Sequence, residues 1–348
     1  MHGPDLIVTN FNPRFTGVSA TAAAVTQALS RRYNLRLAGQ PLPGLGDPVT
    51  FRDAIRLTRT GPQHRPFTIW HVRRNAEMQA AIFARDVLRL RMRIVFTSAA
   101  QRRHSAWPRW LIGRMDAVIA TTDESAGFVP NVWAVVPHGV DCDAFRPAAD
   151  RAAAWATTGF PGGRGVAAIG RVRPEKGTDL FVQAMIRALP GLPDVTALVI
   201  GLTKPGEAGF LQGLKDQVAQ AGLTGRILFP GEIAPDRLRE LIPGLSLLVA
   251  LPRYEGYGLT PLEAMASGVP VVASDAGHFR AFLGQNEAGR IVEVGDAGAA
   301  AGAVTAILSD PGLHGRLAQD ARRRAETGFG IETEASGIAA VYERLWAE

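Results

Sequence analysis

Residues 252–270 read PRYEGYGLTPLEAMASGVP, a stretch in which an apolar strand ends, a glycine-containing loop follows and a helix begins. The loop glycines allow the backbone to approach a ligand closely, and the first turn of a helix presents unpaired amides to an anion. Thr260 is a candidate helix cap, with Pro261 at the first helical position and Glu263 at the third position of a capping box. The stretch therefore predicts a strand-loop-helix unit that suits a diphosphate.

The chain on both sides of this stretch alternates short apolar runs with longer helical patterns, which is typical of βαβ units and parallel sheets. Two such series occur, and they predict an α/β fold with two Rossmann-like domains. Strands are expected near 6–8, 35–37, 67–70, 94–96, 117–119 and 133–136, and then near 166–169, 197–200, 227–229, 247–249 and 271–273. Helices are expected over 19–32, 76–90, 178–188, 208–221, 235–241 and 261–267, followed by three more from about 297 onward.

The boundary between the two series is predicted at residues 145–150, whose sequence FRPAAD breaks both periodicities. We place the first domain at 1–148 and the second at 149–330, and we expect a C-terminal helix over about 331–348 to pack back on the first domain. Ligands bind at the carboxyl ends of parallel strands, so two facing domains would hold a ligand between them. The predicted site is the interdomain cleft.

The composition favours a cytoplasmic protein. The 348 residues are enough for two domains, and no segment approaches the roughly 20 apolar residues of a membrane-spanning helix. The N-terminus has neither the basic region nor the apolar helix of a signal peptide. The single cysteine, Cys142, suits a reducing compartment.

The net charge of +6 is distributed unevenly along the chain. Residues 1–150 contain 19 arginines against 11 acidic residues, whereas residues 151–348 contain 19 basic and 21 acidic residues. The arginine-rich first half fits either a solvated surface or a face that contacts anionic lipid headgroups or an acidic acceptor. No recognition helix, zinc finger or RNA-binding sheet accompanies the charge, so we expect no nucleic-acid partner.

A second loop, GRVRPEKG at 170–177, also follows a predicted strand and precedes a predicted helix. Alone it reads as a charged surface loop. If it lies beside the loop at 252–270, Arg171 and Lys176 form a cationic clamp for a departing nucleoside diphosphate. A cation at 4 Å contributes about 4 kcal/mol at an effective dielectric constant near 20. Two such groups can replace a metal ion, so we predict no metal site.

The N-terminal series contributes two weaker candidates. The backbone amides of Gly17 and Val18, at the entry of the first helix, can point toward the same phosphates, although a simple turn capped by Ser19 is the alternative. His71 follows the strand that ends at Trp70 and is expected to point into the cleft, although an isolated histidine is more often structural.

Four motifs, taken in order, resemble the retaining family-4 glycosyltransferases of the GT-B fold. They are His-Gly-Val-Asp-x3-Phe at 138–145, Gly-Arg-x4-Lys-Gly at 170–177, Glu-x7-Glu at 255–263 and Gly-Val-Pro-Val-Val at 268–272. With the N-terminal glycine loop, the resemblance covers nearly the whole chain. It implies a glycosyltransferase that needs neither a metal nor another cofactor.

The resemblance also implies roles for individual residues. Arg171 and Lys176 would hold the donor diphosphate. Glu255 would contact sugar hydroxyls, and Glu263 would bind the ribose. The backbone amides of Gly258, Leu259 and Thr260, at the start of the helix, would contact the phosphate and the sugar. His71 matches a family position near the donor sugar.

A narrower resemblance concerns residues 70–78, 96–104 and 252–263, which are similar to lipopolysaccharide core mannosyltransferases. Those enzymes move mannose from GDP-mannose onto an acidic Kdo sugar of a lipid A precursor. The resemblance implies an anionic glycolipid acceptor and contact with the inner face of the membrane. Guanidinium groups match carboxylates and phosphates well, so the candidates for acceptor binding are Arg73, Arg74, Arg102 and Arg103.

Two alternatives stay open at this point. One keeps the fold but uses a UDP-sugar, because base choice depends on backbone near Ile233 that the sequence does not resolve. The other is a non-catalytic protein that binds sugar nucleotides or polyanions. The chain also departs from the family pattern at Ser98, where many members have histidine, and at Ala281, where a glutamate is usual.

Overall fold

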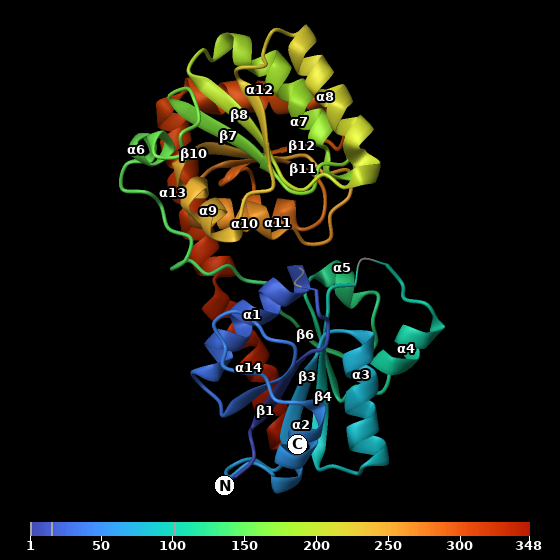
Figure 1. The fold of residues 1–348 in the computed structure, drawn as a ribbon. Helices are drawn as coiled ribbons and strands as arrows, with labels where there is room; N and C mark the ends of the chain where they lie inside the picture. The colour runs from blue at the N-terminus through green and yellow to red at the C-terminus, as the bar shows by residue number, and fades with distance from the viewer. Residues whose placement is uncertain (1, 15–16, 101) are drawn as a thin grey trace. The chain divides into compact units, whose positions relative to one another are not determined.

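The computed structural model describes residues 2–14, 17–100 and 102–348, whose contacts divide the chain into two compact units (Figure 1). Unit 1 comprises the chain up to Gly139 together with Gly330–Glu348, and unit 2 comprises Val140–Phe329. These units are defined by contacts between residues. The domain limits that the sequence predicts near 148 and 330 remain predictions. The predicted α/β fold with two Rossmann-like halves is confirmed, because each unit contains one six-stranded sheet in which every pair of strands is parallel.

The sheet of unit 1 has the strand order β2-β1-β3-β4-β5-β6. Every residue of β1 and β3 is buried, as expected for a parallel sheet covered on both faces. The strands are β1 (Leu6–Asn10), β2 (Leu35–Gly39), β3 (Thr68–Val72), β4 (Met92–Ser98), β5 (Ala117–Ala120) and β6 (Val132–Val135).

Helices cover both faces of this sheet. One apolar cluster joins β1 to α1 and α14, including the buried Tyr342 and Trp346, while another joins the opposite face to α2, α3 and α4. The helix expected over 76–90 ends at Ile82 and continues as a π-helical turn over Phe83–Val87. The helices of unit 1 are α1 (Gly17–Ser30), α2 (Phe51–Thr60), α3 (Asn75–Ile82), α4 (Ala106–Ile112), α5 (Asp123–Ala126) and α14 (Ile331–Ala347).

The sheet of unit 2 has the strand order β12-β11-β10-β7-β8-β9. The short edge strand β12 was missed in the sequence, because its four residues GRIV contain only two apolar side chains. The strands are β7 (Arg164–Ile169), β8 (Val195–Ile200), β9 (Ile227–Gly231), β10 (Leu245–Ala250), β11 (Val271–Ser274) and β12 (Gly289–Val292).

The helices of unit 2 also form two layers. One apolar cluster contains residues of α7, α8 and α12, and the other contains residues of α6, α9, α10, α11 and α13. None of the described helices is long and apolar enough to cross a bilayer. The helices are α6 (Arg151–Ala156), α7 (Thr178–Ala188), α8 (Ala208–Gln220), α9 (Pro235–Leu241), α10 (Leu259–Ala266), α11 (Phe279–Leu283), α12 (Ala297–Ser309) and α13 (Pro311–Phe329).

Each sheet has one point at which the strand order reverses. In unit 1 this switch point lies between β1 and β3, and in unit 2 it lies between β7 and β10. Open parallel sheets bind ligands at the carboxyl ends of the strands that flank such a point. The loops that follow β1, β3, β7 and β10 are therefore the places to look for a site.

Candidate functional site

The loops after β7 and β10 lie against each other, as the clamp hypothesis requires. The backbone N–H of Arg253 donates to the carbonyl of Glu175 at 2.9 Å. Gly177 has a φ of 66° and a Cβ added there would lie 1.7 Å from the carbonyl oxygen of Leu251, so only glycine allows this approach. The two motifs recognised separately in the sequence thus form one surface at the switch point of unit 2.

Lys176 and Glu255 form an ion pair between these two loops. Their side chains are 26% and 17% exposed, so the pair is shielded yet within reach of a ligand. The backbone N–H of Gly256 donates to the other carboxylate oxygen of Glu255 at 3.0 Å, which fixes its orientation. Arg171, at the start of the first loop, is exposed and has no ion pair within the described parts of the chain.

The start of α10 differs from the sequence prediction. Its N-cap is Gly258, with a φ of 80°, so the helix begins at Leu259 and Thr260 lies inside the first turn. The capping box with Glu263 is therefore wrong, because the left-handed glycine turns the chain into the helix two residues earlier. No side chain caps this terminus, which leaves the amides of Leu259 and Thr260 oriented for an acceptor group on a ligand.

Glu263 has no structural partner to explain its place in α10. Burial raises the pKa of its carboxyl to about 7, with the charge of Arg239 acting in the opposite direction. Among the described residues, none donates a hydrogen bond to this carboxyl or pairs with it. Glu263 therefore does not cap α10. The ribose contact predicted from the sequence would give its carboxyl a hydroxyl of the ligand as partner.

Sequence reasoning missed a supporting ion pair. Arg253 makes a bidentate contact with Asp179 of α7, at 2.8 and 2.6 Å, and also donates to the carbonyl of Pro174 at 2.5 Å. The fork of Arg253 thereby holds the loop that carries Lys176. The sequence did contain a signal for this pair, because Arg253 belongs to the stretch 252–270 and Asp179 lies in the first helical turn after the loop 170–177.

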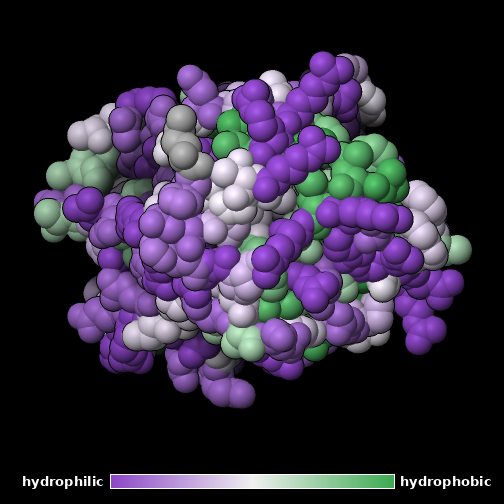
Figure 2. Space-filling model, turned by 90° about the horizontal axis from the view of Figure 1, so that it is seen from below, coloured by the Kyte–Doolittle hydropathy of each residue, from purple (hydrophilic) through white to green (hydrophobic). Residues whose placement is uncertain are grey.

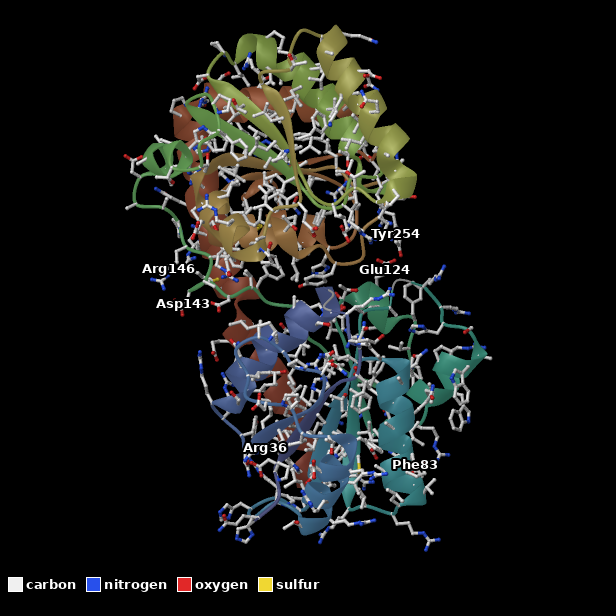
Figure 3. All side chains as sticks on the ribbon, viewed as in Figure 1. Arg36, Phe83, Glu124, Asp143, Arg146 and Tyr254 are labelled. Carbon is white, nitrogen blue, oxygen red and sulfur yellow. The ribbon has the colours of Figure 1, made fainter. Side chains whose placement is uncertain are left out.

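Ile233 is the remaining donor candidate of unit 2 that the sequence predicts. Ile233 follows β9 and packs against the apolar cluster that contains Leu262. Tyr254, beside Glu255, projects from the loop after β10 and is 56% exposed (Figure 3). The contact of Ile233 with a nucleotide base stays a prediction.

His71 is fully buried at the switch point of unit 1. Its Nδ1 contacts the hydroxyl of Tyr342, and its Nε2 lies 2.7 Å from the hydroxyl of Thr97. Burial, together with the nearby charge of Arg73, holds the pKa of the imidazole well below its ordinary value. The ring is therefore neutral with both nitrogens engaged, and its role near a donor sugar stays a prediction.

Arg74 is committed to contacts inside unit 1. It donates to the side chains of Asn10 at 2.9 Å, Glu77 at 3.2 Å and Ser19 at 3.0 Å. Ser19 lies inside α1, which begins at Gly17, so the alternative in which Ser19 caps this helix is wrong. Its hydroxyl instead helps to anchor Arg74 at the end of β3.

Gly17 and Val18 form the start of α1, and Val18 is 42% exposed. Part of the loop that leads to them, residues 15 and 16, lies outside the described residues. Their contact with the donor phosphates stays a prediction.

Arg102 and Arg103 are exposed in the segment that precedes α4. On α4 itself, Trp107 and Trp110 are 52% and 51% exposed, and their rings stack with centroids 5.1 Å apart. On the face shown in Figure 2, hydrophobic residues form patches among hydrophilic ones, and the largest patch lies right of centre. The stacked pair thus adds exposed apolar surface to the helix that follows the segment with Arg102 and Arg103.

The known proteins that this chain resembles in sequence are glycosyltransferases. The chain is 44% identical, over 98% of its length and 97% of the relative's, to lipopolysaccharide core biosynthesis mannosyltransferase LpsB of Rhizobium meliloti (strain 1021). It is 42% identical, over 98% of its length and 96% of the relative's, to lipopolysaccharide core biosynthesis mannosyltransferase LpcC of Rhizobium leguminosarum bv. viciae. Residues 158–324 match the family described as glycosyl transferases group 1.

Solved structures show the same fold. Anabaena HepE, crystallised in complex with UDP and glucose, superposes with a TM-score of 0.80 over 97% of this chain and 99% of that chain, at 16% identity. The C-terminal domain of a glycosyl transferase group 1 family protein (LpcC) from Francisella tularensis covers 56% of this chain and 100% of that chain, with 36% identity and a TM-score of 0.54. The expected GT-B fold is confirmed by these superpositions.

Proposed function

Because the chain belongs to the group 1 glycosyltransferases, we propose that it transfers mannose from GDP-mannose to a Kdo-containing lipopolysaccharide core acceptor, with retention of configuration. The observation that carries the proposal is the Lys176–Glu255 ion pair at the switch point of unit 2. It joins a phosphate-binding cation and a hydroxyl-binding carboxylate in one place, as a sugar-diphosphate donor requires. The full-length likeness to two mannosyltransferases supports the choice of sugar.

The ion pair is the resting state of the donor site. When the diphosphate binds, Lys176 exchanges Glu255 for phosphate oxygens, and Glu255 becomes available to the hydroxyls of the mannose. Arg171 adds a second cation from the same loop. This exchange keeps both side chains in position before the donor arrives, which lowers the cost of ordering them on binding.

The start of α10 completes the donor site. The uncapped amides of Leu259 and Thr260 contact the phosphate and sugar oxygens, and Glu263 accepts hydrogen bonds from the ribose hydroxyls. The backbone near Ile233 contacts the base. The unpaired carboxyl of Glu263 supports this assignment, because a buried polar group gains most from a ligand partner.

In the transfer step, the bond between the anomeric carbon and the diphosphate oxygen breaks as an acceptor hydroxyl attacks the same face of the sugar. The hydroxyl proton passes to the departing phosphate oxygen. Arg171 and Lys176 stabilise the negative charge that develops on the diphosphate, so no metal ion is needed.

The acceptor is an anionic glycolipid, which places the work of the enzyme at the inner, cytoplasmic face of the membrane. Arg102 and Arg103 bring exposed positive charge to the segment before α4. The half-exposed rings of Trp107 and Trp110 suit the interface between lipid headgroups and hydrocarbon. Together they support a peripheral contact of α4 with anionic lipid.

Thermal denaturation with a panel of nucleotide sugars and a metal chelator tests the donor assignment, because a specific ligand raises the melting temperature. We expect GDP-mannose and GDP to stabilise the protein in the chelator, and UDP-glucose to do so much less. If only UDP-sugars stabilise the protein, the donor is a UDP-sugar and the assignment as a glycosyltransferase still holds. If no nucleotide or nucleotide sugar shifts the melting temperature, the proposed function is wrong.

A further inference from the structure

Arg73 immediately follows β3, at the switch point of unit 1. Its Nη1 atom is shielded from solvent and has no hydrogen-bond partner. Within the described ranges, the guanidinium also has no ion pair within 4 Å. A charged group in this situation is costly unless a partner arrives from outside the chain.

The carboxylate of Glu77 is already engaged by other groups. It accepts hydrogen bonds from the hydroxyl of Thr9 at 3.1 Å, the backbone N–H of Phe11 at 3.2 Å and the side chain of Arg74 at 3.2 Å. From Arg73 it receives only the backbone N–H, at 2.8 Å. Glu77 therefore organises the loop without pairing with the guanidinium of Arg73.

Glu334 of α14 is engaged as well. It accepts from the ring of His138 at 2.9 Å and from the backbone N–H of Gly139 at 2.8 Å. Burial raises the pKa of Tyr342, so this neighbouring hydroxyl is neutral and supplies no negative charge. The positive charge of Arg73 is left without a committed counter-ion.

Two more unpaired polar atoms follow the neighbouring strand. β4 lies beside β3 in parallel register, with Val72 opposite Phe96. Among the residues that the structure describes, the buried hydroxyl of Ser98, the last residue of β4, has no hydrogen-bond partner, and the same holds for Nε2 of His104 in the segment after it. Three unsatisfied polar atoms thus belong to residues at or after the carboxyl ends of two adjacent strands, and buried atoms of this kind are rare in proteins.

We propose that Arg73 binds the anionic group of the sugar acceptor, a carboxylate or a phosphate, and that Ser98 and His104 bind hydroxyls of the same ligand. The inference rests on the proposed function and deepens it by assigning the acceptor subsite to the carboxyl edge of β3 and β4. It also distinguishes Arg73 from Arg74, whose side chain is held by Glu77 and its neighbours. A guanidinium fork matches both kinds of anion, and the flanking groups select a hydroxylated ligand.

Binding to the full-length protein tests the subsite without the transfer reaction. The probes are free Kdo, inorganic phosphate and mannose, measured by calorimetry in the presence of GDP. We expect Kdo to bind the wild type and to bind R73Q about 10- to 100-fold more weakly, because a charge-assisted hydrogen bond is lost. Arg73→Lys should retain part of the affinity, Ser98→Ala should lose several-fold, and mannose should bind far more weakly than Kdo throughout.

The matched control is Arg36→Gln on β2, where the arginine is exposed at the surface (Figure 3). This variant should bind Kdo as the wild type does. R73Q should also melt no lower than the wild type without ligand, since it removes a shielded, unpaired charge. A fall in melting temperature with unchanged Kdo affinity would make Arg73 a structural residue and overturn the subsite.

The outcomes separate this inference from the proposed function. Dependence of phosphate binding alone on Arg73 would identify a phosphate as the anionic group and keep the subsite. If the wild type binds GDP but binds neither Kdo nor phosphate, the proposed acceptor subsite is wrong and the donor site still stands. Kdo binding without any GDP binding or mannose transfer would overturn the proposed function and leave the subsite standing.

Discussion

The two switch points of the molecule carry their positive charge in different ways. Between β7 and β10, Lys176 is neutralised by Glu255 before any ligand is present. At the end of β3, the guanidinium of Arg73 has no ion pair with any carboxylate of residues 2–14, 17–100 or 102–348. Lys176 must therefore exchange partners to bind a ligand, whereas the guanidinium of Arg73 gains its first ion-pair partner on binding. Substitutions that remove charge should therefore affect folding and function differently in the two units.

The largest effect is expected where the pair of unit 2 is broken. Glu255→Gln should lower kcat/KM for mannose transfer by at least about 100-fold, as removal of one transition-state contact typically does. Its melting temperature should change by only a few degrees, because the pair is partly exposed to solvent. Steady-state kinetics and thermal denaturation measure the two quantities.

Glu293→Gln is the matched control for Glu255, because Glu293 is an exposed glutamate of the same unit. The charge-swapped double variant, Lys176→Glu with Glu255→Lys, sharpens the comparison further. It should restore the ion pair and the fold but not the activity. Recovery of transfer by the swapped pair would show that the pair is only structural.

The next effect concerns folding of unit 1. Arg74→Gln should lower the free energy of unfolding by about 3 kcal/mol, because it removes the charge that pairs with the fully buried Glu77. Urea denaturation measures this change, with Arg36→Gln as the control. Equal stability of Arg74→Gln and the wild type would show that Arg73 and Arg74 do not differ in the way that their contacts indicate.

A pH-dependent effect is expected at Glu263. Burial raises the pKa of its carboxyl from 4.5 to about 7, so the folded protein holds this proton more tightly than the unfolded chain does. The free energy of unfolding should therefore fall as pH rises from about 4.5 to 7, by on the order of 2 kcal/mol. Glu263→Gln should remove this loss and melt higher than the wild type at pH 8, while binding GDP more weakly.

Melting curves at pH 5 and pH 8 check the prediction for Glu263, with Glu293→Gln as the control. Parallel pH dependence in Glu263→Gln and the wild type would contradict it. Tighter GDP binding by this variant would argue against the ribose contact.

The smallest effect should come from the surface of α4. Replacing Trp107 and Trp110 by serine should weaken binding to vesicles that contain anionic phosphatidylglycerol by several-fold, since two interfacial rings are lost. Leu202→Ser, at an apolar position of unit 2 that is 44% exposed, is the control. Co-sedimentation measures the binding, and unchanged binding of the double variant would remove α4 from the membrane contact.

Much of the fold could be predicted because the strands of both sheets are short apolar runs separated by helical spacing. The expected helices over 178–188 and 235–241 match α7 and α9 residue for residue. The exceptions have physical reasons. β12 has a mixed sequence at a sheet edge, and the start of α10 depends on the left-handed backbone of Gly258, which no side-chain pattern reports.

The candidate site could be predicted only in part. Motif spacing placed Lys176 and Glu255 on neighbouring loops, but it could not show that they pair with each other. Two further features depend on side chains from distant segments: the ion pair between Arg253 and Asp179, and the absence of a described partner for Nη1 of Arg73. Such three-dimensional contacts leave no local signature in a single sequence.

The chain crosses from unit 1 to unit 2 and returns, so that α14 supplies core residues such as Tyr342 and Trp346 to the first sheet. On the ribosome, unit 2 is complete as soon as residue 329 has emerged, while unit 1 must wait for the last helix. Any chain that stops before Gly330 lacks the residues of α14 in the apolar cluster around β1, so that α1 covers this face only in part. Quality control of this enzyme should therefore act on its first-made half, and a lesion at the C-terminus should appear as misfolding of the N-terminal sheet.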